Sequence, residues 1–177
     1  MATPDTIIGI DPSIAACGVA IYQPGVPDVT AHTIRTYPHH GTDADRIMRI
    51  ICKLEGLVGP RDHDADLREV VAIEVQHARR GQWAQKFAAD TMRGPAAVRG
   101  AVVVWAHLRG AEVVEVQPGA ANRALAGNAR ASAAQMRAMA LTRYGLKTTG
   151  HAADALGFAL AGEAIVRMAD RMEETGE

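Results

Sequence analysis

The sequence predicts an α/β fold in which a mixed β-sheet carries helices on its faces. Five short segments have the length and the bounding turn residues that are typical of strands; they cover residues 6–11, 17–22, 29–37, 69–74 and 112–116. The first three follow one another directly, as antiparallel neighbours do, and helical patterns separate the later ones, as in parallel connections. With 177 residues, the chain is expected to form a single domain over residues 1–177.

Three predicted strands and one helix occupy the N-terminal third. TIIGID and CGVAIY are short apolar runs, and VTAHTIRTY alternates between apolar and polar residues. The loop QPGVPD, between the second and third strands, contains the Pro and Gly residues of a turn. A helix is predicted to begin at Thr42, which forms a capping-box pattern with Asp45, and to end at Gly59 and Pro60.

Helical patterns dominate the chain after the strand at 69–74. The first of them runs to Met92, and the Gly94-Pro95 pair predicts a break or a new helix start. Residues 96–108 are apolar on most sides, which predicts a buried helix. Pro, Ser and Gly signals then bound three more helices, at 118–125, 132–144 and about 151–172.

The composition is that of a globular protein. Apolar residues make up 48% of the chain and charged residues 22%. There is no run of 18 apolar residues, so no membrane span is expected, and the first residues lack the pattern of a signal peptide. Cys17 and Cys52 lie in apolar patterns without a CxxC motif, which indicates buried thiols in a cytoplasmic protein.

The charge distribution is more informative than the net charge of −1. Residues 1–74 carry −5, residues 75–147 carry +8 and residues 148–177 carry −4. Nearly all of the cations in the middle section are Arg, which suits bidentate contact with phosphate. If the charge distribution is considered alone, helices with solvated basic faces explain it as well as a phosphate-binding surface does. Acidic clusters on either side favour a polyanionic substrate, because an acidic metal site needs basic surroundings to admit phosphate.

Four potential metal ligands stand at the ends of predicted elements. Asp11 ends the first strand, Glu74 ends the strand at 69–74, and His151 and Asp154 share one face at the start of the last helix. Carboxylates and imidazole are ligands for Mg²⁺ or Mn²⁺, and their convergence would favour metal-assisted phosphodiester hydrolysis. Each residue also has an ordinary explanation as a turn, strand-end or capping group, and the spacing alone leaves both interpretations open.

Four motifs in order resemble the RuvC-type Holliday junction resolvases of the RNase H-like superfamily. IIGIDPSIAACGVAIY resembles the opening motif of the family, with Gly18 seven residues after the Asp. VVAIE is similar to its second acidic strand, VRGAVVVWAHLRGAEVVEV to its central helix and following strand, and HAADALGFALAG to its C-terminal acidic helix. The resemblance covers about residues 6–165.

The resemblance implies an RNase H-like five-stranded mixed sheet flanked by helices, and a homodimer with no membrane association. It implies an endodeoxyribonuclease that acts on branched DNA, the Holliday junction, by paired symmetric nicks that leave 5′-phosphates. Two Mg²⁺ (or Mn²⁺) ions per active site would be held by Asp11, Glu74, His151 and Asp154, which are also the expected catalytic residues. Asp11 would bridge both ions, and the position of His151 holds Asp in some members and His in others.

The expected DNA-binding residues are basic or aromatic and lie in the middle section: Arg79, Arg80, Trp83, Lys86, Arg123 and Arg130. Trp83 has an alternative role as an ordinary core or interface residue, and residues 96–108 are the candidate for part of the dimer interface. The chain departs from the family at Ser13, where many members have Gly, and near His77, where members carry an aromatic wedge. A basic family position falls near Asn122.

Three other functions remain open from the sequence. One is a nuclease of the same fold that acts on another branched DNA or on RNA, and a second is a non-catalytic junction-binding protein. The third is an actin-like ATPase, which shares a strand-Asp-loop-strand opening but needs two such domains and a far longer chain.

Overall fold

The computed structural model describes residues 4–61, 67–75 and 84–176. The strands are β1 (Thr6–Asp11), β2 (Ala16–Tyr22), β3 (Val29–Arg35), β4 (Glu69–Glu74) and β5 (Glu112–Val116). A short 3₁₀ helix, η1 (Pro38–His40), precedes α1. The α-helices are α1 (Asp43–Val58), α2 (Ala84–Leu108), α3 (Pro118–Ala126), α4 (Ala133–Tyr144) and α5 (Gly150–Thr175).

The five strands form one mixed sheet in the order β3-β2-β1-β4-β5. β1 pairs antiparallel with β2, which pairs antiparallel with β3. On its other side β1 pairs parallel with β4, and β4 pairs parallel with β5. The predicted five-stranded mixed sheet is therefore confirmed. Because β1 and β4 are adjacent and parallel, their carboxyl ends lie at the same edge of the sheet.

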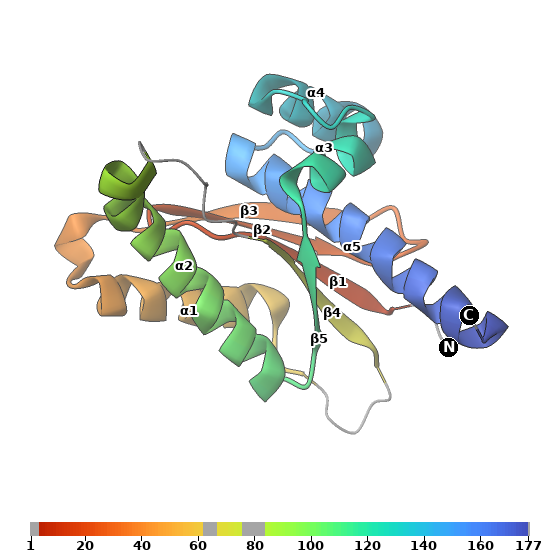
Figure 1. Cartoon of the computed structure of the whole chain (residues 1–177), viewed down its shortest axis with the longest axis horizontal. Helices are drawn as coiled ribbons and strands as arrows, with labels where there is room; N and C mark the ends of the chain where they lie inside the picture. Colours follow the sequence, from red (N-terminus) through yellow and green to blue (C-terminus); the bar gives the residue numbers. More distant parts are fainter. Residues whose placement is uncertain (1–3, 62–66, 76–83, 177) are drawn as a thin grey trace.

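Helices cover both faces of the sheet (Figure 1). α1 and α2 cover one face, where Ile8 and Ile10 of β1 pack with Ile50 and Val102. α3, α4 and α5 lie on the other face, where Ile7 packs near Phe158 of α5. The alternation of side chains along β1 thus sends successive residues into two separate cores.

α5 approaches the sheet very closely because β1 contains a glycine. A Cβ atom at Gly9 would collide with the backbone of α5 at Ala155 and Ala159. The alanines of α5 in this region are fully buried, as expected for a helix that packs backbone to backbone on a strand. This close contact sets the height of α5 above the carboxyl end of β1.

Two expectations about the helix at 84–108 are wrong. Pro95 lies inside α2 and does not break it. Proline removes one backbone hydrogen bond, and the burial of Val98, Val102 and Trp105 stabilises the helix beyond it. The helix is also not buried on most sides, because the side chains of Val104 and Leu108 are 59% and 80% exposed.

The two cysteines differ in their burial. Cys17 is buried in β2, as predicted, but Cys52 is exposed on the outer side of α1. The apolar pattern around Cys52 belongs to its neighbours Ile50 and Leu54, which face the core.

Within the described ranges, no helix has the length and hydropathy needed to span a bilayer.

A buried arginine ties α1, α2 and β4 together. Arg109 follows α2 and donates to both carboxylate oxygens of Glu55 and to Glu69, at 2.9–3.0 Å. Its guanidinium also donates to the carbonyl of Gly59 and lies 5.0 Å from the ring of Trp105. These contacts satisfy a cation that is only 7% exposed, so Arg109 has a structural role.

Candidate active site

Asp11 and Glu74 lie side by side at one edge of the sheet. Each is the last residue of its strand, and the strands pair in parallel with Ile10 opposite Ile73. Both carboxylates follow a run of fully buried residues. The two strands are therefore fixed by their cores up to the residue before each acid.

The first turn of α5 is held against the same edge. Thr149 caps the helix by accepting a hydrogen bond from the backbone N–H of Ala152, and its hydroxyl also hydrogen-bonds Thr33 of β3. Gly18 lies opposite Asp11 in the β1–β2 pair, and a Cβ atom there would collide with the carbonyl of His151. The glycine of the opening motif therefore leaves room for the backbone turn that carries His151.

His151 makes direct contact with Asp11. Its Nδ1 lies 2.6 Å from Oδ2 of Asp11, and because an ionised carboxylate only accepts, Nδ1–H is the donor. This hydrogen bond raises the pKa of His151 above its ordinary value, with burial opposing the shift. The His151 side chain is 47% exposed and that of Asp11 is 14% exposed, so the imidazole is the more solvent-accessible partner of the pair.

The other two carboxyl groups have strongly perturbed pKa values. Burial, followed by the negative charges of Asp11 and Asp154, raises the pKa of Glu74 to about 7. Burial and the charge of Asp11 raise the pKa of Asp154 to about 6, although His151 and Arg137 act in the opposite direction. The three acids therefore repel one another at close range, and such coupled carboxylates are typical of functional sites.

Asp11, Glu74 and Asp154 line one cavity of about 220 Å³. His151 is not among the lining residues, although its ring contacts Asp11. In this conformation no three His, Cys, Asp or Glu side chains of the described ranges stand close enough together to hold an ion. The donor set nevertheless fits a hard divalent cation, which prefers carboxylate oxygens and would offset the burial and the repulsion that raise the pKa of Glu74.

The cavity includes residues that sequence reasoning missed. Phe158 forms part of its wall and lies one helical turn after Asp154, so helical spacing alone could have identified it. Asn122 also lines the cavity, but its amide nitrogen donates to the carbonyls of Ala129 and Ala131. Arg137 of α4 lowers the pKa of Asp154 by its charge, and no local motif marks it as part of the site.

The structure describes two of the six predicted DNA-binding side chains. Arg123 is exposed on α3, next to Asn122. Arg130 is exposed in the α3–α4 connection, between the two alanine carbonyls that bind Asn122. Each is therefore adjacent in sequence to a residue that lines the acidic cavity, but neither lines it. Of the other candidates, Lys86 lies in α2 with its side chain outside the described part; Arg79, Arg80 and Trp83, like the wedge position near His77, are outside it altogether.

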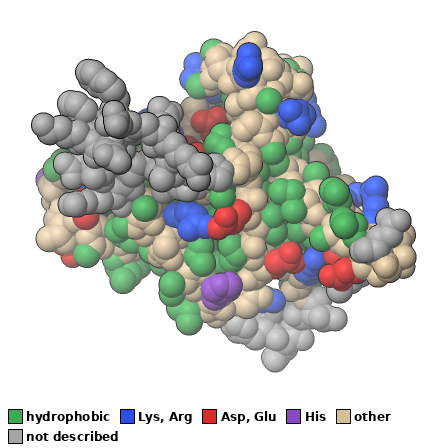
Figure 2. Space-filling view, in the orientation of Figure 1, with side chains coloured by type: hydrophobic (Ala, Val, Ile, Leu, Met, Phe, Trp, Pro, Cys, Tyr) green, Lys and Arg blue, Asp and Glu red, His purple; other side chains and the backbone are tan. Residues whose placement is uncertain are grey.

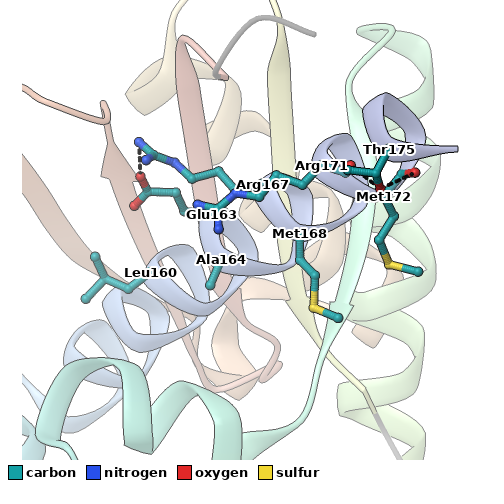
Figure 3. Close-up of a pocket in the computed structure, with 8 residues that line it drawn as sticks. All are labelled: Leu160, Glu163, Ala164, Arg167, Met168, Arg171, Met172 and Thr175. Atoms are coloured by element: carbon teal, nitrogen blue, oxygen red, sulfur yellow. Dashed lines mark hydrogen bonds and ion pairs between the residues drawn. The ribbon is translucent and has the colours of Figure 1, made fainter. Parts of the chain in front are cut away.

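A larger pocket of about 610 Å³ lies along the C-terminal half of α5, away from the acidic cavity (Figure 3). Its charged residues include Glu163 and Arg167, which pair with each other at 2.7 Å. Its apolar residues include Met168 and Met172, which are 65% and 45% exposed. Since it brings no group of acids together, this pocket is not the candidate for hydrolytic chemistry.

Comparison with known proteins identifies a single family. A family model described as crossover junction endodeoxyribonuclease RuvC matches residues 7–162. A crossover junction endodeoxyribonuclease RuvC of Mycobacterium bovis is 28% identical over 175 residues, which cover 93% of this chain and 86% of that protein. The protein of the same name from Corynebacterium diphtheriae is 31% identical over 160 residues, covering 86% of this chain and 90% of that protein.

Solved structures agree with the sequence comparison. Thermus thermophilus RuvC in complex with a Holliday junction substrate superposes with a TM-score of 0.69 at 26% identity, over 93% of this chain and 96% of that one. A second structure of RuvC from the same organism gives a TM-score of 0.64 over the same shares of the two chains.

Proposed function

Because the chain belongs to the crossover junction endodeoxyribonuclease RuvC family, we propose that it resolves Holliday junctions by two paired, symmetric nicks. The single observation that carries this proposal is the acidic cavity, in which three carboxylates from β1, β4 and α5 surround one space at the sheet edge. The family is one of metal-dependent nucleases. We infer that Mg²⁺ or Mn²⁺ binds here, as two ions per active site.

Asp11, Glu74 and Asp154 would hold the ions, with Asp11 between the other two groups. Bound ions would neutralise charge on the phosphate and lower the pKa of a water molecule. Hydrolysis would add water at phosphorus and break its bond to the 3′ oxygen, which would leave a 5′-phosphate and a 3′-hydroxyl. The carboxylates contribute by standing on rigid strand and helix ends, which fixes the position of the scissile phosphate.

His151 would act from the edge of the cavity. Its Nδ1–H donates to Asp11, so Nε2 is free to exchange a proton with the attacking water or with the leaving oxygen. Direct ligation of an ion by His151 is the alternative. The hydrogen bond to Asp11 supports the first role, because it orients the ring and fixes the tautomer.

A homodimer would place two such sites on the two strands that must be cut. The exposed apolar face of α2 supports this, because Val104 and Leu108 extend into solvent in the isolated chain. Figure 2 shows hydrophobic side chains exposed over the C-terminal half of α2. A symmetric dimer would bury this face against its own copy. If so, Leu108→Glu shifts the sedimentation coefficient from that of a dimer to that of a monomer.

The experiment that tests this function uses a labelled four-way junction, a matched linear duplex and structured RNA, each with Mg²⁺, Mn²⁺ or EDTA. We expect paired symmetric nicks on the junction alone, dependent on the metal. Equal cutting of RNA would instead favour another RNase H-like activity. Binding without cutting on any substrate would favour a non-catalytic junction-binding protein.

A further inference from the structure

A groove runs along the outer side of the molecule between the edge strand β3 and α1. It consists of two adjoining hollows of about 470 and 540 Å³ that share Cys52 and Lys53. The cationic, histidine and thiol residues of both hollows define what we call the basic groove: His32, Arg35, His40, Arg49, Cys52 and Lys53. None of these residues belongs to the acidic cavity.

The basic groove has an excess of positive charge, because three cations and one acid line it. Arg49 and Lys53 are exposed on successive turns of α1, and neither forms an ion pair within the described residues. The acidic residues of α1 are engaged elsewhere or lie at its start. Asp43 pairs with Arg46, and Glu55 pairs with the buried Arg109.

One acid lines the groove, and its charge offsets one of the three cations. Asp45 accepts hydrogen bonds from the backbone N–H and the hydroxyl of Thr42, which lowers its pKa. The section of sequence with the most negative net charge, residues 1–74, therefore presents a basic surface at this place.

The groove begins at the active-site edge of the sheet. β3 runs in the same direction as β1, because each pairs antiparallel with β2. Arg35 ends β3 as Asp11 ends β1, and the charge of Arg35 acts on His151. The hydrogen bond between Thr33 and Thr149 joins this end of β3 to the start of α5. A nucleic-acid strand bound at the acidic cavity can therefore continue past Arg35 into the groove.

An aromatic cluster stands at the same end. The ring of Tyr37 stacks on His39 with centroids 5.4 Å apart and an interplanar angle of 5°, and His40 meets both rings edge-on. Tyr37 is 46% exposed, so its ring is not part of the hydrophobic core. Flat exposed rings beside unpaired cations are the combination that binds nucleic-acid strands through stacking and phosphate contact.

We propose that the basic groove binds the sugar-phosphate backbone of the DNA arm next to the cleaved strand. This inference rests on the proposed function, since it takes branched DNA as the substrate. The charged side chains of Arg49 and Lys53 contact phosphates. Arg35 contacts the DNA strand where it passes between the groove and the acidic cavity. The groove thereby extends the DNA contact from the site edge along the outer side of α1.

The exposed thiol of Cys52 allows a direct test. Alkylation of Cys52 is measured by peptide mass spectrometry in EDTA, with and without a four-way junction at concentrations that give full binding in a mobility-shift assay. DNA in the groove should slow the alkylation of Cys52 severalfold. Cys17 is an internal control, because burial raises its pKa to about 12 and keeps it unreactive with or without DNA.

Charge variants supply the second measurement. The double variant Arg49→Gln, Lys53→Gln should reduce the slope of log K against log salt by about 0.9 for each phosphate that the variant no longer binds. The matched control is Arg167→Gln, Arg171→Gln, which removes the same charge from α5 and should leave the slope unchanged. Circular dichroism checks that both variants are folded.

The outcomes separate the two proposals. If the junction binds but Cys52 stays equally reactive and the slope does not change, the groove proposal is overturned and the proposed function stands. If no junction binding occurs in the unmodified protein, both are overturned. Protection of Cys52 together with a reduced slope in the α1 variant alone would establish the groove as a DNA contact.

Discussion

Gly18 of β2 lies directly against the backbone carbonyl of His151 in the first turn of α5. The same glycine pairs with Asp11 across the β1–β2 ladder. The absence of one side chain therefore sets the distance between the strand that carries Asp11 and the helix that carries His151 and Asp154. The glycine of the opening motif is thus a spacer of the active site.

Replacement of Gly18 by Ala should separate these elements. The new methyl group collides with backbone, which cannot give way as a flexible side chain can, so we expect destabilisation of about 1–3 kcal/mol. Cleavage by the folded fraction should fall more than its DNA affinity, because Asp154 is displaced. Urea denaturation and single-turnover cleavage measure the two effects. As a control, Gly56→Ala meets no atom within 4 Å and should be neutral or slightly stabilising.

Asp11→Asn should abolish cleavage and preserve junction binding. The amide keeps the shape of the side chain but removes the charge that faces Glu74, Asp154 and His151, and we expect a loss of at least about 10²-fold in rate. Thermal denaturation with and without Mg²⁺ or Mn²⁺ gives an independent measurement. The ions should raise the melting temperature of the unmodified protein and raise it much less for the variant. Equal stabilisation of both proteins would show that the ions bind elsewhere.

Glu74 should make the stability of the metal-free protein depend on pH. Its pKa is raised from 4.5 to about 7 on folding, so between these values the folded protein holds a proton that the unfolded chain has lost. Stability from this group is therefore fully present below pH 4.5 and is lost as the pH rises through about 7. The expected loss is on the order of 1–2 kcal/mol after allowance for solvent screening.

Denaturation in a chelator at several pH values measures this effect. In Glu74→Gln, the decrease in the free energy of unfolding above pH 4.5 should be smaller. The decrease that remains comes from Asp154, whose pKa is raised to about 6. Glu173→Gln, on the exposed end of α5, should leave the pH profile as it is. A profile that is unchanged in Glu74→Gln would contradict the raised pKa of Glu74, and with it the effects of burial and of the neighbouring acids.

His151 should tolerate Asp better than Ala. Asp cannot donate the hydrogen bond that Nδ1–H makes to Asp11, but its carboxylate could accept a proton from the water or hold an ion, and Ala can do neither. We expect Ala to reduce the cleavage rate by about 10²-fold or more, and Asp to retain most of it. The pH–rate profiles should also differ, since only the unmodified protein contains an imidazole at this position. Identical rates for Ala and the unmodified protein would exclude His151 from the chemistry.

Arg109→Met should affect stability and not the active site. The change leaves Glu55 and Glu69 without their buried partner, which costs about 3–5 kcal/mol. The folded fraction should still cleave at its normal rate, because Arg109 lies outside the acidic cavity. Arg167→Met is the surface comparison. The Arg167 side chain, which pairs with Glu163, is 46% exposed. Loss of this pair should cost less than about 1 kcal/mol of stability.

Local signals predicted most of the elements. Thr42 and Ser132 begin α1 and α4 with reciprocal capping hydrogen bonds, and Gly127 and Gly145 end α3 and α4 in the left-handed conformation. These signals work because the backbone groups at helix ends need nearby partners. The prediction failed at Pro95, where burial of the residues that follow it outweighs a local helix breaker.

The amino-acid sequence by itself determined the order of the elements, the family and the four residues on which the proposed chemistry depends. It did so because strand ends, helix starts and motif spacing are local properties of the chain. Only the tertiary structure decided that Asp11, Glu74 and Asp154 share one cavity while His151 hydrogen-bonds Asp11 without lining that cavity. It also placed Arg35, Arg49 and Lys53 in one groove, although the surrounding sequence is acidic. The physical reason is that distance and charge act through space, between residues as far apart in the chain as position 11 and position 151.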